Sequence, residues 1–348
     1  MKYIKYLLFL LLIAFIAIAI YIAVQPNEYT VTRSKTIEAP ASLIYDEVID
    51  FKNWKDWNAW IEENPEMIIT YPEQTKDIDG SYTWLNKGET GRMTTIAAKP
   101  NTSITQNMQF GDQPSAQVDW SFTPNEDGST EVTWTISGHD LPFGFKAYSA
   151  YSGGMDKQIG PYYERSLELL DRKVVESMKQ HSTKVDGLTE YGGGFYLYKT
   201  TSASGKNISK IVARQHEEII NYMSKNTIIQ AGMPFTIYND MNPSTGNVIM
   251  TQAIPVMNNV INDNTSEILC GYMPKTTALK TTLTGNYTYL PKAWDTAYKA
   301  ITELKLERSQ DKPFEIYIND SKKVPNPSLW KTEIYIPITL TDTLTSKL

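Results

Sequence analysis

The sequence has 348 residues, longer than one typical domain and long enough for two. Its 41% hydrophobic and 21% charged residues, with 8 Trp and 22 Tyr, are typical of packed globular domains and argue against a disordered chain. The net charge of -6, without a clustered basic face, argues against nucleic acid as a partner. A single cysteine, Cys270, excludes an internal disulfide and a thiolate metal cluster.

An uncharged apolar run occupies residues 6–24 and predicts a helix of about 28 Å, close to the thickness of a bilayer core. Lys2 and Lys5 precede the run, and this cation bias places the N-terminus in the cytoplasm. We therefore expect residues 1–27 to form a single membrane anchor that holds extracytoplasmic domains.

A cleaved signal peptide is the competing interpretation of this segment, because Ala17 and Ala19 offer small residues to a peptidase. The run is long for a signal peptide, and the bulky residues Tyr21 and Ile22 follow at once. A retained anchor is therefore preferred.

Residues 28–180 predict a domain in which one strand and two short helices precede an antiparallel meander. The strand covers 29–38, and Pro40 starts the first helix. Apolar residues then alternate along short runs separated by turn signals, so one sheet face is covered. The cover is a long amphipathic helix predicted over 160–179, and Ser152-Gly153-Gly154 before it is interpreted as a mobile loop.

This order of elements, together with the opening IEAPASLIYDEVIDFKNWKDWNAW, resembles the START-like or polyketide-cyclase (SRPBCC) superfamily. The resemblance implies a helix-grip fold that binds hydrophobic ligands between the curved sheet and the long helix. It implies a cavity lined by the inward-facing aromatic residues Tyr82, Trp84, Trp120 and Trp134. The alternative is that these rings simply fill a core, as large side chains at period two usually do.

Residues 184–340 predict a second α+β domain, which follows a polar linker at 182–187. The first half is predicted to contain a strand over 188–200, a helix over 207–225 and strands over 234–239 and 247–255. The second half repeats this order, with a strand over 267–284, a helix over 290–306 and strands over 314–319 and 331–339. The repeated order of strand, helix, strand, strand predicts two similar halves related by a pseudo-twofold axis.

The last two strands each carry a Glu-Tyr pair on one face, Glu315 with Tyr317 and Glu333 with Tyr335. If the isoleucine faces pack on the helices, the other face presents carboxylates beside aromatic rings, an arrangement that recognises organic cations. An ordinary solvated sheet face is the alternative, and it is preferred for Glu315.

For Glu333 the pocket interpretation is preferred, because GNYTYLPKAWDTAYKAI and WKTEIYIPI resemble segments of the GyrI-like effector-binding domain. The resemblance implies that Glu333 is the pocket carboxylate, with Tyr335, Tyr287 and Trp294 as neighbours. Some members of that family hydrolyse small molecules, and multidrug-responsive regulators carry the domain beside a helix-turn-helix segment. This sequence has no such segment, so a transcriptional role is not expected.

No other motif predicts chemistry. Gly192-Gly193-Gly194 lies within a strand pattern and not at a phosphate-binding turn, and His216-Glu217-Glu218 lacks the second histidine of a zinc site. We expect no metal, no cofactor and no catalytic residue. The predicted function is a membrane-anchored binding or sensing protein for a hydrophobic or cationic aromatic molecule. The alternatives are a hydrolase or cyclase with Glu333 as general base, and a structural envelope protein whose cavities are filled.

Overall fold

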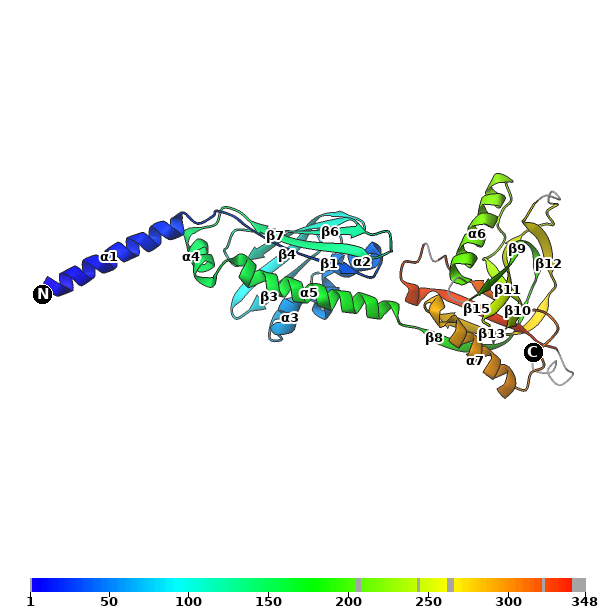
Figure 1. The fold of residues 1–348 in the computed structure, drawn as a ribbon. Coiled ribbons are helices and arrows are strands. Elements are labelled where there is room, and N and C mark those ends of the chain that lie inside the picture. The colour runs from blue at the N-terminus through cyan, green and yellow to red at the C-terminus, as the bar shows by residue number, and fades with distance from the viewer. Residues whose placement is uncertain (1, 205–207, 243–244, 262–265, 321–322, 340–348) are drawn as a thin grey trace. The chain divides into compact units, whose positions relative to one another are not determined.

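The computed structural model describes residues 2–204, 208–242, 245–261, 266–320 and 323–339, so the predicted bounds 1, 207 and 340 lie outside it. The chain is α+β and divides into two compact units, and the division falls between Ser177 and Met178 in the sequence (Figure 1). Helix α1 (Lys2–Ala23) is the predicted N-terminal helix.

Over residues 2–177, seven antiparallel strands form one sheet in the order β1-β7-β6-β5-β4-β3-β2. The strands are β1 (Tyr29–Ile37), β2 (Ile68–Thr70), β3 (Ser81–Asn86), β4 (Glu89–Lys99), β5 (Ser103–Phe110), β6 (Ala116–Pro124) and β7 (Thr130–Gly138). The helices are α2 (Ala41–Ile49), the 3₁₀ turn η1 (Phe51–Asp56), α3 (Ala59–Glu63), α4 (Phe143–Ser152) and α5 (Met155–Met178).

Helix α5 covers one face of this sheet, as the helix-grip prediction requires (Figure 1). Its buried residues recur at helical spacing, with Tyr163, Leu167, Leu170 and Val174 among them. The Tyr163 ring stacks on Trp134 of β7 with 3.6 Å between ring centroids. Burial of each such side chain stabilises the fold by about 1.5–3 kcal/mol.

Two local predictions are corrected in this domain. The long helix begins at Met155, five residues earlier than expected, and Ser152, expected in a loop, is the last residue of α4, a helix that the sequence analysis did not predict. Only Gly153 and Gly154 interrupt the two helices, with φ of 86° and 99°. Glycine adopts these left-handed values without the strain that a side chain would bring, so α4 ends there.

Among the described residues of the second unit, eight strands form a sheet in the order β12-β9-β11-β10-β14-β15-β13-β8. These strands are β8 (Ser182–Tyr191), β9 (Gly194–Ser204), β10 (Phe235–Asn242), β11 (Asn247–Val256), β12 (Leu269–Met273), β13 (Thr276–Thr284), β14 (Phe314–Tyr317) and β15 (Lys331–Pro337). The helices are α6 (Ile208–Lys225), α7 (Leu290–Glu303) and the 3₁₀ turns η3 (Tyr287–Tyr289) and η4 (Pro327–Leu329).

The strand order is symmetric about the β10–β14 pair, so the prediction of two similar halves is confirmed. One half is β9-α6-β10-β11 and the other is β13-α7-β14-β15. Each half is preceded by one further strand that pairs with the opposite half, because β8 joins β13 and β12 joins β9. This exchange closes the two halves into one sheet.

The exchanged strands correct two predictions. The expected linker at 182–187 belongs to β8, and the expected single strand over 188–200 is two strands joined at Gly192-Gly193. A Cβ at Gly193 would lie 2.2 Å from the carbonyl oxygen of Met273, so only glycine fits this turn. Likewise β12 and β13 divide the strand expected over 267–284.

Candidate functional site

The register of β14 and β15 places their two Glu-Tyr pairs on opposite faces of the sheet. Glu315 lies directly opposite Ile334, and Ile316 lies opposite Glu333. Directly opposed residues of antiparallel strands point to the same face, so Glu315 shares the face of Ile334 and Glu333 shares the face of Ile316. Ile334 and Ile336 pack with Ala293 and Ala297 of α7, as expected, whereas Phe314 and Ile316 pack in a separate core.

Glu315 is therefore on the helix-covered face, and it is only 1% exposed. Its Oε1 accepts hydrogen bonds from the hydroxyl groups of Tyr238, at 2.9 Å, and Tyr317, at 2.7 Å. Its Oε2 accepts a hydrogen bond from Nε1 of Trp294 of α7, at 2.9 Å. The prediction that Glu315 lies on a solvated face is wrong, because the register turns this residue toward the helix.

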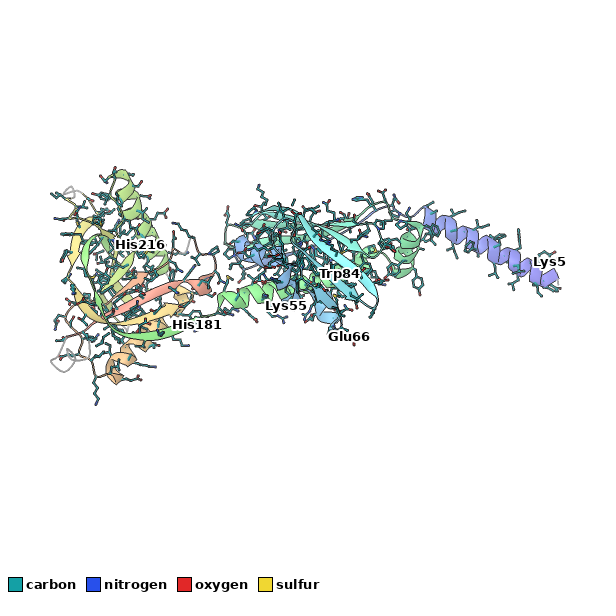
Figure 2. The ribbon with its side chains drawn as sticks, turned by 180° about the vertical axis from the view of Figure 1, so that it is seen from behind. Lys5, Lys55, Glu66, Trp84, His181 and His216 are labelled. Carbon is teal, nitrogen blue, oxygen red and sulfur yellow. The ribbon has the colours of Figure 1, made fainter. Side chains whose placement is uncertain are left out.

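The charge of Glu315 is not balanced by a base. Burial raises the pKa of this carboxyl group, and the three hydrogen bonds oppose that shift. Among the described residues, no lysine, arginine or histidine forms an ion pair with it. His216 lies on α6 (Figure 2), and its ring centroid is 5.5 Å from that of Tyr317. Burial lowers the pKa of His216 to about 4, so this imidazole is neutral at pH 7.

Further aromatic rings extend the site beyond the hydrogen-bonded ones. The Tyr287 ring lies 5.5 Å from Tyr317 and 4.7 Å from Trp330, and the Tyr238 ring lies 5.2 Å from Trp294. All of these rings are partly exposed. We call this set the Glu315 cluster, and it comprises Glu315, Tyr238, Tyr287, Trp294, Tyr317 and Trp330.

Glu333 has a different environment on the other face. Its Oε1 accepts a hydrogen bond from Nζ of Lys280 at 2.5 Å, and its Oε2 accepts one from the Tyr335 hydroxyl group at 2.7 Å. The side chains of Lys280 and Glu333 are 25% and 19% exposed, so the pair is largely shielded. The expected grouping of Glu333 with Tyr287 and Trp294 is therefore corrected, since those rings gather around Glu315.

The sequence thus predicted the pairing of Glu315 with Tyr317 but assigned Tyr287 and Trp294 to Glu333. It missed Tyr238 and Trp330. A signal for Tyr238 exists in the repeat, because its strand β10 in the first half corresponds to β14, which carries Glu315. Trp330 lies just before β15, at the end of η4, where strand alternation carries no information.

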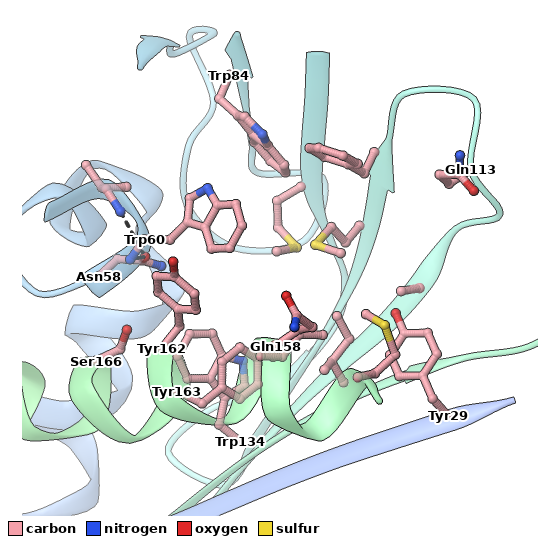
Figure 3. Close-up of a pocket in the computed structure, with 18 of the residues that line it drawn as sticks. Tyr29, Asn58, Trp60, Trp84, Gln113, Trp134, Gln158, Tyr162, Tyr163 and Ser166 are labelled. Atoms are coloured by element: carbon pink, nitrogen blue, oxygen red, sulfur yellow. Dashed lines mark hydrogen bonds between the residues drawn. The ribbon is translucent and has the colours of Figure 1, made fainter. Parts of the chain in front are cut away.

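The first domain contains a cavity of about 350 Å³ between its sheet and α5. Figure 3 shows Trp84 of β3 facing Gln158 and Tyr163 of α5 across the open interior. Of the predicted residues, Tyr82, Trp84 and Trp134 line the cavity. Trp120 does not, because it is 1% exposed within the core, where its Nε1 donates to Gln106 at 3.2 Å.

The cavity lining is mainly apolar and aromatic, with Asn58, Gln113, Gln158 and Ser166 as polar members, and among the described residues it includes no Asp, Glu, Lys, Arg or His. The Trp84 ring is held across Gly91 of β4, where a Cβ would lie 2.1 Å from the indole. Asn58 is the N-cap of α3: its Oδ1 accepts a hydrogen bond from the backbone N–H of Trp60 at 2.9 Å. This cap fixes the start of the helix that carries Trp60 into the cavity wall. Local backbone features therefore shape the cavity.

Comparison with known proteins divides the chain in the same way. Residues 28–175 match the family model described as polyketide cyclase / dehydrase and lipid transport. Residues 195–339 match the GyrI-like small molecule binding domain. No curated protein matches the chain.

Three solved structures illustrate what the chain is similar to. The EcmrR C-terminal domain is 16% identical, with a TM-score of 0.38, and the match covers 46% of this chain and 99% of that one. EcmrR in a complex with DNA is 19% identical, with a TM-score of 0.40 and coverage of 56% and 72%. Protein CV1439 from Chromobacterium violaceum is 13% identical, with a TM-score of 0.32 and coverage of 42% and 96%. On the family matches and the fold, the chain joins a polyketide cyclase-like domain of the SRPBCC class to a GyrI-like small-molecule-binding domain.

Proposed function

We propose that the chain is a membrane-tethered binding protein whose GyrI-like domain binds a lipophilic organic cation at the Glu315 cluster. The observation that carries this proposal is a carboxylate that is 1% exposed, ringed by aromatic side chains and without a basic partner among the described residues. A carboxylate beside aromatic rings is the arrangement that recognises organic cations, as the sequence predicted, but Glu315 replaces Glu333 as the recognition group.

The physical argument concerns the cost of an unpaired buried charge. An ionised carboxylate in an apolar interior is unfavourable unless it is paired, and phenol and indole donors compensate only in part. A bound cation supplies the missing charge, and the faces of Trp294, Tyr287 and Trp330 offer cation–π contacts of about 0.5–2 kcal/mol each. Glu333 has no such need, because Lys280 already pairs with it.

The proposed tether is α1. Among the described residues, one helix has the length and composition to cross a membrane, at Tyr3–Ala23 with a mean hydropathy of 2.9, and it makes no buried contact. Lys2 and Lys5 near its start support a cytoplasmic N-terminus and an extracytoplasmic position for both domains.

For the first domain we propose an uncharged apolar ligand. A cavity of about 350 Å³ falls within the usual range for small-molecule sites, and its lining offers no ionic partner. The alternative of a structural protein with filled cavities does not account for this open interior.

The test of the Glu315 cluster compares two ligands of equal shape, N-methylquinolinium and the uncharged 1-methylnaphthalene, on the full chain in mild detergent. We expect N-methylquinolinium to raise the melting temperature and 1-methylnaphthalene to have a much smaller effect, because a ligand that binds only the native state stabilises it. The variant Glu315→Gln should weaken binding of the cation at least tenfold, or about 1.4 kcal/mol.

Glu333→Gln is the matched control, since it makes the same chemical change on the opposite face of the same sheet. It should leave the affinity for N-methylquinolinium unchanged within twofold. Equal loss of affinity in both variants, or equal binding of the charged and uncharged ligands, would rule out Glu315 as the group that recognises the cation.

A further inference from the structure

Helix α4 presents a row of aromatic side chains to the outside of its domain. None of its ten residues is buried, and Phe143, Tyr148 and Tyr151 are 52%, 55% and 92% exposed. Its only charged residue is Lys146. Aromatic residues are enriched where a protein meets the headgroup region of a bilayer, so this helix has the composition of an interfacial element.

The start of α4 is fastened to the residues that lead out of α1. The carbonyl oxygen of Asn27 accepts a hydrogen bond from the backbone N–H of Leu141 at 3.2 Å. The ring of Tyr29 stacks on Phe145 of α4 with 5.7 Å between centroids. Only four residue steps separate Ala23, the end of α1, from Asn27. At roughly 3.5 Å per residue, the chain holds Asn27 within about 14 Å of the end of α1, and α4 begins two residues after Leu141, the partner of Asn27.

Helix α4 is also a wall of the cavity in the first domain. Phe145 and Tyr148 line that cavity, and so do Met155 and Gln158 at the start of α5. Gly153 and Gly154 join the two helices in the left-handed conformation.

We propose that α4 lies in the headgroup region of the bilayer that α1 crosses, and that the cavity behind it takes up an uncharged lipophilic molecule from that bilayer. This inference rests on the proposed tethering by α1. The occupant of the aromatic surface is a lipid bilayer, because the short connection through Asn27 brings that surface to the membrane. The cavity ligand is uncharged, because its described lining has no ionic group.

The position of α4 can be tested with the full chain in phosphatidylcholine vesicles. Tyr151→Cys, in a Cys270→Ser background, is labelled with a fluorophore whose emission reports water exposure. We expect a lipid with a spin label near its headgroup to quench this fluorophore at least twofold. Glu126→Cys is the control, since Glu126 is exposed in the turn between β6 and β7. The turn that carries Glu126 joins the end of β6 to Thr130, the first residue of β7. Thr130 lies eight residues along β7 from Gly138, the partner of Tyr29. The control position is therefore about 26 Å from Tyr29 along the strand.

The outcomes separate the inference from the tether on which it rests. Quenching at 151 but not at 126 supports the interfacial position. If the chain floats with the vesicles but neither label is quenched, α4 is not at the membrane although the tether stands. If the chain does not float with the vesicles, the tether itself fails, and this inference fails with it.

Loading of the cavity is tested with a long-chain alcohol that carries a diazirine, dissolved in the same vesicles. After photolysis, we expect crosslinked peptides that contain cavity residues such as Met93 and Met108. The alkyl sulfate of the same diazirine chain should label these peptides at least fivefold less, since its charge is excluded. Crosslinks confined to α1, or equal labelling of the cavity by both probes, would overturn the uptake of an uncharged molecule.

Discussion

At the scale of single residues, the two carboxylates differ in how their charge is balanced. Glu315 receives hydrogen bonds from neutral donors only, and burial raises its pKa. Glu333 receives a hydrogen bond from the Lys280 ammonium group. A pair of opposite charges is already neutral, whereas a carboxylate bound by neutral donors keeps its charge when it ionises. Glu315 is therefore the residue whose ionisation a bound cationic ligand would favour.

The raised pKa of Glu315 predicts a definite dependence of stability on pH. When the folded pKa lies above the unfolded value, the stabilising contribution is complete below the unfolded pKa and is lost as pH rises through the folded pKa. We therefore expect Glu315→Gln, which does not titrate, to become more stable relative to the unmodified chain between pH 5 and pH 8. Melting temperatures of both proteins across this range measure the difference.

His216 does not confound this comparison, because it is present in both proteins. Because its pKa is lowered in the folded state, His216 contributes stability at pH values above the unfolded histidine pKa. That contribution is lost as pH falls toward 4. A melting-temperature difference that stays constant from pH 5 to pH 8 would show that Glu315 does not titrate in this window.

The same carboxyl group predicts proton release on binding. Where Glu315 is partly protonated, a cation binds the ionised form and displaces the proton, so the affinity for N-methylquinolinium should rise with pH and then level off. Titration calorimetry in two buffers of different ionisation enthalpy measures the released protons. Glu315→Gln should release none, and an equal release from the variant would assign the proton to another group.

At the scale of elements, close backbone packing shapes the cavity of the first domain. Strand β4 passes under Trp84 at Gly91, where there is no room for a side chain. Strand β7 likewise passes under the ring of Tyr29 at Gly138, where a Cβ would lie 2.4 Å from the ring. Both aromatic rings line the cavity, so the shape of its walls depends on glycines in the neighbouring strands.

Gly91→Ala should therefore push Trp84 from its position and destabilise the domain by about 1–3 kcal/mol, the usual cost of overpacking. Gly144→Ala is the matched control, because its Cβ would meet open space in α4 and its φ is not in the left-handed region. The control should be as stable as the unmodified chain or slightly more stable, by up to about 1 kcal/mol, because alanine has the higher helix propensity. Equal stability of the two variants would show that Trp84 moves freely.

At the scale of the whole molecule, a charge bias at one end of an apolar helix predicts the side of the membrane on which both domains lie. Alkaline phosphatase, which is active only after export, can be fused at the end of the full chain and expressed in a bacterium. We expect an active fusion, and a fall in activity of at least twofold when Lys2 and Lys5 are both changed to Glu, because the positive-inside bias is then removed. An inactive fusion at normal expression would place the domains in the cytoplasm.

Much of the fold follows from local patterns in the sequence. Alternation along the strands, helical spacing in residues 160–179 and the repeated order of elements depend on neighbours in the chain, and they predicted both domains. The exchange of β8 and β12 between halves was missed, because strand pairing joins residues far apart in sequence. Helix α4 was missed because its apolar residues face outward and leave no core-facing stripe.

At the candidate site, too, local sequence pattern and tertiary structure decided different things. By itself, the sequence determined that Glu315 and Tyr317 share one face of their strand and that Glu333 and Tyr335 share one face of theirs, since alternate side chains in any strand point the same way. Only the tertiary structure decided which face each pair occupies. The register of β14 against β15 makes that choice, and a shift of one residue would exchange the two faces.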